Sequence, residues 1–285
     1  MTLQTNIIIF VYGTLLSGMP LSDALAKSDF IGHGKINGAL YDLGHYPGLK
    51  NINGKGIVYG ELYAVDQSTL DKLDQIEGYF PNRPDHSLYL RQQVGVRPFD
   101  GGSTIKAYSY FYRDRCRATR SITCGDYRRY RLEQSDGSQW YIAYGSNMSS
   151  ARLRARLGHD RIGSVEIGHL EGYALRFNKR AHGGGVYANL AYQGAGHRCP
   201  FVAYHLDLDD IHLLDAYEGE PNHYVRLGLP FPKADGRLGL GHVYIAAPER
   251  VIPDQTPDPN YLRHLRDGYA EHGFDPDALP GAPLP

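Results

Sequence analysis

The chain has 285 residues, of which 42% are hydrophobic and 21% charged, with 30 basic side chains against 31 acidic ones. This length fits two domains of ordinary size, and the apolar content is sufficient for a sizeable core, which excludes disorder for most of the chain. A formal charge of -1 at neutral pH argues against a protein devoted to nucleic acid, because binding the phosphate backbone requires an excess of Lys and Arg.

Cysteine content and apolar runs indicate a reduced compartment. The three cysteines, Cys116, Cys124 and Cys199, form neither a disulfide framework nor a paired zinc motif. The longest apolar run, residues 7–16, is too short to cross a bilayer and lacks the flanks of a signal peptide. We therefore expect a cytoplasmic protein with no membrane partner.

The expected elements, in chain order, are short aromatic or β-branched strands and a few helices. Strands are predicted at 6–12, 56–65, 106–112, 140–145, 200–206 and 241–247. Helices are predicted after Ser68, after Ser149 and after Asp209, with glycines at their ends, and near the C-terminus at 260–273. Strand and helix do not alternate regularly, so we expect an α+β fold with a small mixed β-barrel in each half.

The sequence repeats itself. Residues 61–78 align without a gap to residues 202–219 at an offset of 141. VYGTL at 11–15 corresponds to AYGSN at 143–147, and YLR at 89–91 corresponds to YVR at 224–226. This common order predicts two related domains, at 1–112 and 137–285.

The segment between the predicted domains, 113–136, has seven arginines against four acidic residues. We interpret it as a basic linker. A charged run of this kind is usually solvated and binds nothing in particular, although it could recruit a partner.

A tight glycine turn after a strand occurs once in each half. In the second half the turn precedes a helix, so the N–H groups of Gly145, Ser146 and Asn147 could bind an anion such as a carboxylate. The equivalent turn around Gly13 favours a shared role, but duplication would copy a purely structural turn as well.

One glutamate ends each repeated helix. The negative end of the helix dipole disfavours the ionised carboxylates of Glu77 and Glu218, and burial among aromatic neighbours would add to this effect. Both glutamates are therefore candidates for proton transfer near neutral pH, the alternative being a surface glutamate in a turn. Two tyrosines follow each glutamate: Tyr89 and Tyr110 stand 21 residues apart, and Tyr224 and Tyr244 stand 20 apart.

The order of these motifs resembles the gamma-glutamyl cyclotransferase superfamily. VYGTL (11–15), LYDLGHYPGL (40–49), VYGELYAVD (58–66), LDQIEGY (73–79) and YLR resemble its gamma-glutamylamine and butirosin-type branch. YIAYGSNM (141–148), RFNK (176–179), HGGGVYANL (182–190), LLDAYEG (213–219), YVR and residues 259–274 resemble the branch that gives the superfamily its name.

This resemblance implies cyclisation of gamma-glutamyl amides to 5-oxoproline, without metal or cofactor, on a small β-barrel with added helices. It assigns the catalytic role to Glu77 and Glu218. The residues it implies for substrate binding come from the turns and the tyrosines: Tyr12, Gly13, Thr14, Leu15, Tyr89, Tyr110, Tyr144, Gly145, Ser146, Asn147, Met148, Tyr224 and Tyr244.

Two differences between the repeats predict different ligands. Leu15 occupies the place of Asn147, and the segment from Glu77 to Tyr89 is longer than that from Glu218 to Tyr224. Three alternatives stay open: a non-catalytic binder of gamma-glutamyl compounds, a structural tandem that recruits a partner through its linker, or an enzyme with one working repeat.

Overall fold

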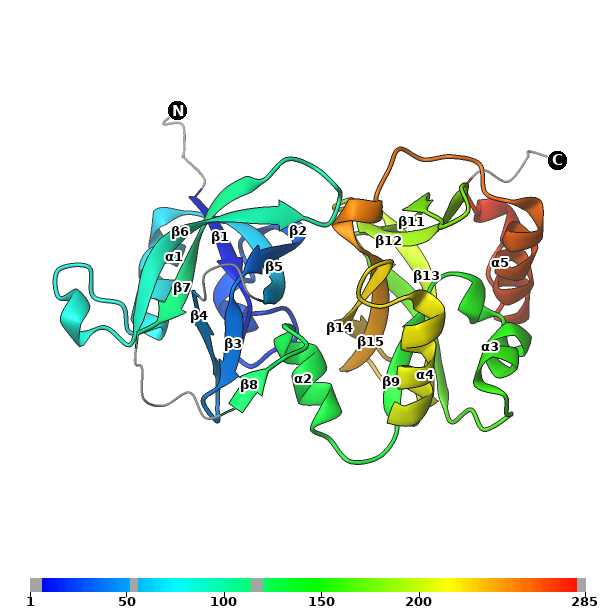
Figure 1. Cartoon of the computed structure of the whole chain (residues 1–285), viewed down its shortest axis with the longest axis horizontal. Helices are drawn as coiled ribbons and strands as arrows, with labels where there is room; N and C mark the ends of the chain where they lie inside the picture. Colours follow the sequence, from blue (N-terminus) through cyan, green and yellow to red (C-terminus); the bar gives the residue numbers. More distant parts are fainter. Residues whose placement is uncertain (1–6, 52–55, 114–119, 281–285) are drawn as a thin grey trace. The chain divides into compact units, whose positions relative to one another are not determined.

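The computed structural model describes residues 7–51, 56–113 and 120–280, and it divides the chain into two compact units at Arg131 (Figure 1). Cys116 lies outside the described residues. The two units are described separately below.

A closed five-stranded barrel forms the first unit, in the order β1-β5-β2-β6-β7 (Figure 1). Its strands are β1 (Ile7–Val11), β2 (Asp29–Asn37), β5 (Ile57–Val65), β6 (Tyr89–Pro98) and β7 (Ile105–Tyr112). The pairs are antiparallel apart from β1 with β7, and β2 closes the barrel on β6 through Gly34 with Pro98 and Lys35 with Arg97. A small sheet, β3 (Ala39–Asp42), β4 (Pro47–Lys50) and β8 (Arg120–Ile122), lies beside the barrel.

Helix α1 (Gln67–Ile76) follows β5 and places Glu77 at its end. It begins with Asp66, whose side chain accepts a hydrogen bond from the Thr69 N–H, so the expected cap at Ser68 is wrong by two residues. Asp and Ser are both good caps, and Asp66 is the residue that directly follows the end of β5 at Val65. Two short 3₁₀ turns, η1 (Ser22–Leu25) and η2 (Pro84–His86), lie in the loops.

The second unit repeats the strand order in a five-stranded sheet, β10-β13-β9-β15-β14. Its strands are β9 (Gln139–Ala143), β10 (Val165–Glu171), β13 (Arg198–Leu206), β14 (Tyr224–Pro232) and β15 (Leu238–Ala246). Strands β10 and β14 are neighbours but do not pair, unlike their counterparts β2 and β6. Pro230 and Pro232 give β14 two positions without an N–H donor, which suits an unpaired edge. The predicted barrel is therefore open in this half.

The remaining elements surround the second sheet. A hairpin, β11 (Tyr173–Arg180) with β12 (Val186–Tyr192), forms a sheet of its own. Its helices are α3 (Ser150–Leu157), α4 (Leu208–Glu218) and α5 (Pro259–Glu271), with 3₁₀ turns η3 (Ser146–Met148), η4 (Pro248–Arg250) and η5 (Pro276–Ala278). Helix α2 (Tyr127–Glu133) spans the boundary between the two units. Helix α4 begins at Asp207, two residues before the expected cap. The α+β class predicted from the sequence is confirmed.

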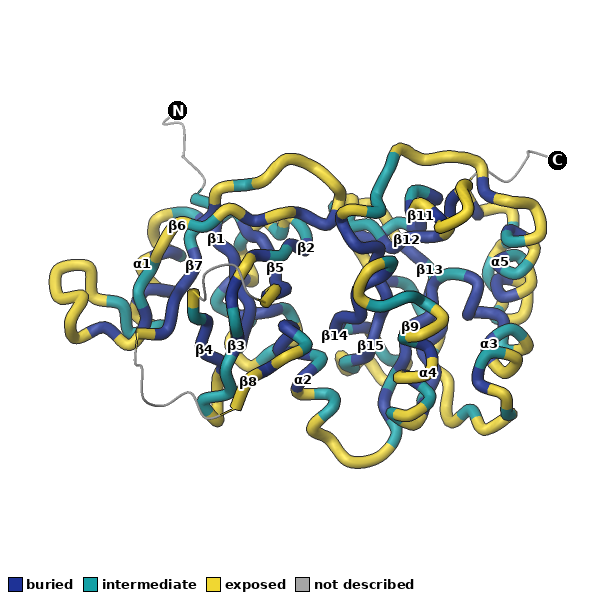
Figure 2. Tube along the Cα trace, viewed as in Figure 1, coloured by how far each residue is buried: buried dark blue, intermediate teal, exposed yellow. Residues whose placement is uncertain are grey.

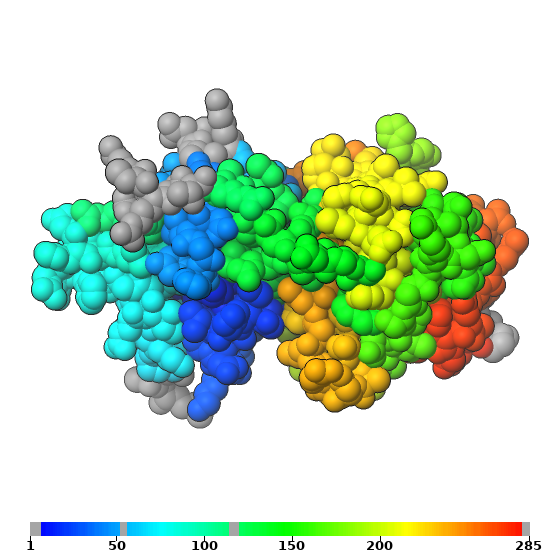
Figure 3. All heavy atoms as spheres, turned by 90° about the horizontal axis from the view of Figure 1, so that it is seen from below, coloured from blue at the N-terminus to red at the C-terminus, as the bar shows by residue number. Residues whose placement is uncertain are grey.

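Much of the predicted basic linker is folded. Strand β8 pairs with β3, and side chains of residues 120–131, green in Figure 3, pack against the blue β3 region of the first unit. Arg128 is 1% exposed and its Nη1 lies 2.7 Å from Glu61 Oε1. The expectation that the arginines here are solvated is therefore wrong for Arg128, because a buried carboxylate provides its partner.

The core of each unit lies within its sheet. Figure 2 shows the barrel strands and the strands of the second sheet as mostly buried, and their loops as exposed. Cys124 and Cys199 are free thiols. Within the described residues, no helix is long and apolar enough to cross a membrane.

Candidate functional site

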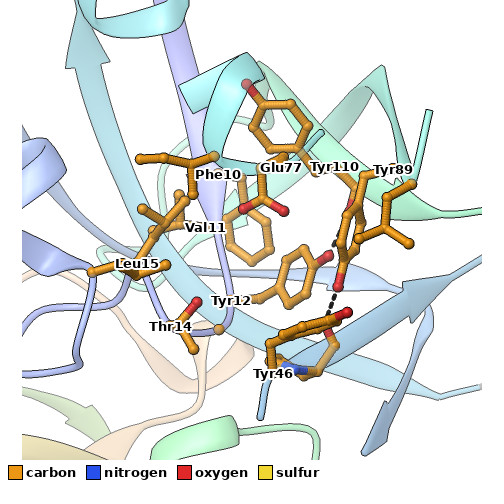
Figure 4. Close-up of a pocket in the computed structure, with 14 residues that line it drawn as sticks. Phe10, Val11, Tyr12, Thr14, Leu15, Tyr46, Glu77, Tyr89 and Tyr110 are labelled. Atoms are coloured by element: carbon orange, nitrogen blue, oxygen red, sulfur yellow. Dashed lines mark hydrogen bonds between the residues drawn. The ribbon is translucent and has the colours of Figure 1, made fainter. Parts of the chain in front are cut away.

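A pocket in the first unit opens at the end of β1, where Glu77 points toward Tyr12 and Tyr89 (Figure 4). The pocket encloses about 530 Å³, including its mouth. Its lining is apolar or aromatic apart from Thr14, Glu77 and the tyrosine hydroxyls, and consists of Phe10, Val11, Tyr12, Gly13, Thr14, Leu15, Leu21, Tyr46, Pro47, Ile76, Glu77, Leu88, Tyr89 and Tyr110. All of the site residues that the sequence proposed for the first half therefore meet in one place.

Glu77 is the ionisable group of this pocket. Within the described part of the chain, its carboxylate accepts no hydrogen bond and forms no ion pair, while its N–H donates to the Leu73 carbonyl at the end of α1. Burial raises the pKa of Glu77 to about 7, because the apolar walls disfavour the charged form. A carboxyl group in this condition can exchange a proton near neutral pH.

Two tyrosine hydroxyls fix the frame of the pocket. Tyr12 donates to the Tyr110 carbonyl at 2.6 Å, and Tyr89 donates to the Pro47 carbonyl at 2.7 Å (Figure 4). A Cβ on Gly13 would lie 2.7 Å from Pro47 Cγ, so a glycine is needed where this loop passes β4. The tyrosines thus hold the walls together rather than projecting free hydroxyls into the pocket.

The loop after β1 presents backbone donors. None of the N–H groups of Gly13, Thr14 and Leu15 donates to a protein acceptor in the described ranges. The Thr14 carbonyl accepts from the Leu21 N–H, which folds the loop back on itself. N–H groups of this kind at a turn can bind an anion, so the anion site expected from the sequence stays a prediction for this loop.

A network of Tyr110, Asp74 and Arg91, which the sequence analysis missed, supports the floor of the pocket. Tyr110 donates to Asp74 Oδ1 at 2.7 Å, and Arg91 Nη1 lies 2.7 Å from Asp74 Oδ2. The network joins α1 to β6 and β7 and thereby fixes the helix end that carries Glu77. Asp74 and Arg91 both recur in the aligned repeat, and this recurrence was the signal that could have identified them.

The second unit has an equivalent but smaller pocket of about 330 Å³, including its mouth. It contains every second-half site residue proposed from the sequence except Met148. Met148 is fully buried, and its carbonyl accepts from Tyr204. The lining consists of Tyr141, Tyr144, Gly145, Ser146, Asn147, Ala188, Glu218, Tyr224, Tyr244 and Tyr261.

Both tyrosine hydrogen bonds that frame the first pocket recur in the second. Tyr144 donates to the Tyr244 carbonyl at 2.6 Å, and Tyr224 donates to the Ala188 carbonyl at 2.7 Å. A Cβ on Gly145 would lie 3.3 Å from Ala188 Cβ, so the close approach of the loop also recurs. Ala188 on β12 thus takes the place of Pro47 on β4.

The support beneath this frame is duplicated as well. Asp215 accepts from Tyr244 at 2.8 Å, and Arg226 Nε lies 2.8 Å from Asp215 Oδ1. This arrangement repeats the contacts that Asp74 makes with Tyr110 and Arg91.

Glu218, in contrast to Glu77, has two protein partners. Arg156 Nη1 lies 2.5 Å from Glu218 Oε1, and Asn147 Nδ2 lies 3.2 Å from the same oxygen. Oε2 accepts no hydrogen bond from the residues that the structure describes. Arg156 lies on α3, an element for which the first unit has η1 instead. The sequence analysis missed Arg156 because it lies outside the aligned block.

Tyr261 is a further residue that the sequence analysis did not assign. Its hydroxyl accepts from the Ala188 N–H at 3.1 Å and so brings α5 to the pocket. As to metals, the described ranges contain no group of three or more His, Cys, Asp or Glu residues able to hold an ion.

A family profile described as Gamma-glutamyl cyclotransferase, AIG2-like matches residues 9–129 and 141–263, so it matches most of the chain in two copies. Gamma-L-glutamyl-butirosin B gamma-glutamyl cyclotransferase of Niallia circulans is 33% identical over 132 residues, which cover 45% of this chain and 80% of that protein. Gamma-glutamylcyclotransferase family protein YtfP of Escherichia coli K12 is 34% identical over 38% of this chain and 98% of that protein.

YkqA of Bacillus subtilis is similar over both repeats. Its sequence is 28% identical over 207 residues, which cover 70% of this chain and 71% of YkqA. Its crystal structure superposes with a TM-score of 0.76 and 24% identity, covering 95% of this chain and 94% of that one. The superposition shows that the fold is shared.

Proposed function

Because the chain belongs to the Gamma-glutamyl cyclotransferase, AIG2-like family, we propose that it cyclises gamma-glutamyl amides to 5-oxoproline and releases the free amine. The observation that carries this proposal is the Glu77 carboxylate. It has no protein partner in the described structure, its pKa is raised to about 7, and it shares a pocket with the unpaired N–H groups of the Gly13 loop.

The reaction needs one substrate and a proton carrier. The α-amino nitrogen attacks the γ-carbonyl carbon, a five-membered ring forms, and the bond from that carbon to the amide nitrogen breaks. An α-ammonium group gives up two protons as the ring closes, and the departing amine gains two, so protons balance when it leaves as ammonium. Holding the folded conformer makes use of the high effective molarity of intramolecular attack, on the order of 10⁵ M or more.

Glu77 performs the proton transfers in this scheme. As a carboxylate it removes the proton from the substrate ammonium, and as the resulting acid it protonates the leaving nitrogen. The N–H groups of Gly13, Thr14 and Leu15 bind the substrate carboxylate or the developing oxyanion, and Tyr12, Tyr89 and Tyr110 keep the walls in place. The apolar lining excludes water, which would compete for the proton.

We extend the same scheme to Glu218. Its Oε2 is open to a ligand although Arg156 and Asn147 bond to Oε1. Asn147 Oδ1 is buried without a hydrogen-bond partner in the described structure, so a donor such as the substrate ammonium would complete it. The loop around Gly145 and Ser146 then binds the anionic end of the substrate.

The alternatives predict different products. A binding protein or a structural tandem would leave gamma-glutamyl amides intact. An enzyme with one working repeat would lose all turnover when the glutamate of that repeat is replaced. If only one pocket is active, the first is the better candidate. Glu218 is in an ion pair with Arg156, whereas the carboxylate of Glu77 can accept a proton without first breaking such a pair.

The test is product analysis on the purified full-length chain. We expect incubation with a panel of gamma-glutamyl amines and amino acids to give 5-oxoproline and free amine in equal amounts by mass spectrometry. Glu77→Gln should abolish turnover of part of the panel, whereas Asp71→Asn, an exposed change on the same helix, should have no effect. Release of glutamate, or no turnover of any member, would contradict the proposal.

A further inference from the structure

Lys179 is a buried cation beside the second pocket. It lies on β11 in the RFNK segment and is 3% exposed. Its Nζ lies 4.7 Å from the ring centre of Tyr224, which lines the pocket, and 5.1 Å from that of Tyr187. His223 Nδ1, 3.1 Å away, accepts a hydrogen bond from it.

No carboxylate in the described structure forms an ion pair with Lys179. Glu218 is near enough for its charge to oppose the effect of burial on Lys179, but its Oε1 is held by Arg156. Burial nevertheless lowers the pKa of Lys179 to about 8, so the ammonium remains protonated at pH 7. A buried ammonium without an anion is costly to the fold.

Besides Glu218, the charged groups that act on Lys179 and its partner His223 are basic. The charge of Arg250 acts on Lys179 and His223, and the His182 ring lies 6.1 Å from the His223 ring. The pKa of His223 is lowered by burial and by these cations, so a neutral imidazole is available as acceptor. Glu218 is the acidic group that acts on Lys179, and its Oε1 is already bonded to Arg156, so a ligand anion would add a further counter-charge to this basic cluster.

The first pocket has no counterpart to this region. The lining of neither pocket contains Lys, Arg or His, but the first is lined in part by the exposed apolar side chains of Leu21, Ile76 and Leu88. In the second, the lining residue Tyr224 contacts Lys179.

We propose that Lys179, supported by His223, forms an anion subsite of the second pocket that binds a carboxylate on the part of the ligand beyond the γ-carbonyl. The inference rests on the proposed function, because it takes the inner pocket to hold the glutamyl group. Ligands with a free carboxylate on the amine side then belong to the second pocket, and ligands without one belong to the first.

The test measures binding without turnover. Glutaryl-L-alanine and glutaryl-L-alaninamide have no α-amino nucleophile, so they cannot cyclise, and they differ only in the outer carboxylate. In calorimetric titrations of the full-length chain at pH 7, we expect one site to bind the acid at least tenfold more tightly than the amide, the usual size of a charge-assisted bond.

Variants assign that preference to Lys179. Lys179→Met should bring the acid-to-amide ratio to about one and leave binding of the amide unchanged, whereas Lys179→Arg should keep most of the preference. Lys233→Met is the matched control, because Lys233 also lies over an aromatic ring of this unit, at 5.6 Å from Trp140. A melting temperature of Lys179→Met equal to or above that of the wild type would match an ammonium that the fold does not need.

The outcomes separate the two proposals. Equal binding of acid and amide by the wild type, or an unchanged ratio in Lys179→Met, overturns the subsite and leaves the gamma-glutamyl pocket standing. Failure of both ligands to bind at either pocket overturns the proposed function and the subsite together.

Discussion

The two pockets share their frame and differ in what surrounds the glutamate. In each, one tyrosine donates to the carbonyl of another pocket tyrosine, a second tyrosine ties a neighbouring strand, and an aspartate–arginine pair supports the floor. Yet Glu77 has apolar neighbours and Glu218 has Arg156 and Asn147. One geometry thus accommodates two electrostatic settings, because the residues that position the glutamate are not the ones that supply its charged and polar neighbours.

The source of the difference is local. Asn147 occupies the place of Leu15, and Arg156 comes from a helix that follows the loop only in the second unit. Neither residue takes part in the shared tyrosine frame, so each can change without displacing it.

The largest expected effect comes from removing the carboxylate of each glutamate to which we assign proton transfer. Glu77→Gln and Glu218→Gln keep shape and hydrogen bonding but lose the basic oxygen, so each should lower kcat/KM by about 10² to 10⁴ for substrates of its own pocket. Steady-state kinetics on a panel of gamma-glutamyl amides would show two complementary sets of losses.

The double variant Glu77→Gln, Glu218→Gln should be inactive on the whole panel. A different result would be that one single variant abolishes every activity and the other, shown to be folded, changes nothing. The chain would then have one active pocket and one inactive pocket.

The next largest effect is expected on stability, from a buried ion pair that occurs in the first repeat and not at the aligned position of the second. Glu61 is buried and pairs with Arg128, whereas the aligned position in the second repeat is Val202. Burial disfavours the carboxylate, but the Arg128 guanidinium and its neighbours outweigh this and lower the pKa of Glu61 to about 2. Arg128→Met should cost about 3 to 5 kcal/mol of unfolding free energy in urea titrations, since it leaves a buried charge without its cation.

Two further variants check this explanation. Arg131→Gln in the same helix should change stability little, because the Arg131 side chain is exposed. Adding Glu61→Val to Arg128→Met copies the second repeat and should restore most of the loss. A double variant as unstable as Arg128→Met alone would mean that packing, not charge, causes the effect.

The raised pKa of Glu77 predicts a pH effect of intermediate size. The carboxyl group titrates near 4.5 when unfolded and near 7 when folded, so the folded state keeps its proton to higher pH. The unfolding free energy should therefore fall as pH rises from about 4.5 to about 7 and stay level above that.

The amide introduced by Glu77→Gln does not titrate, so the variant escapes this loss. Its unfolding free energy should exceed that of the wild type by about 1 to 3 kcal/mol at pH 8 and by nothing below pH 4. Over the same range, kcat/KM of the first pocket in the wild type should rise tenfold per pH unit until about pH 7. A constant difference in stability across pH would show that Glu77 does not titrate as the structure indicates.

The smallest effect concerns the pair Leu15 and Asn147. Asn147→Leu removes donors to Tyr141 and Glu218, so it should lower kcat/KM of the second pocket about tenfold, the usual worth of one hydrogen bond to a charged group. Leu15→Asn should alter the first pocket less, as no partner like Arg156 completes the arrangement there. Equal losses in both pockets would show that the residue acts through packing.

Repetition explains how much the sequence could reveal. The ungapped block at an offset of 141 identified both glutamates, and the common order of the flanking motifs identified the tyrosines that lie near them. It could not reveal Arg156, which has no counterpart. Pro47 and Ala188 escaped notice because they contribute a backbone carbonyl, which any residue type supplies.

Charge patterning failed where burial decided the outcome. An arginine-rich segment is usually solvated, yet Arg128 finds Glu61 across 67 residues of sequence. The pairing across the first barrel, and its absence between β10 and β14, likewise depend on contacts between strands distant in the chain.

The close passage of Gly13 along Pro47, and of Gly145 along Ala188, has a consequence for how such a chain can diversify. The anchor of each loop is a close contact between its glycine and the side chain of a neighbouring strand, and it does not involve the side chains that we propose to contact the ligand. After the duplication, substitutions could therefore accumulate at Leu15, Asn147 or the rim without loosening the anchor. Selection could explore new substrates in one copy while the other kept the original task.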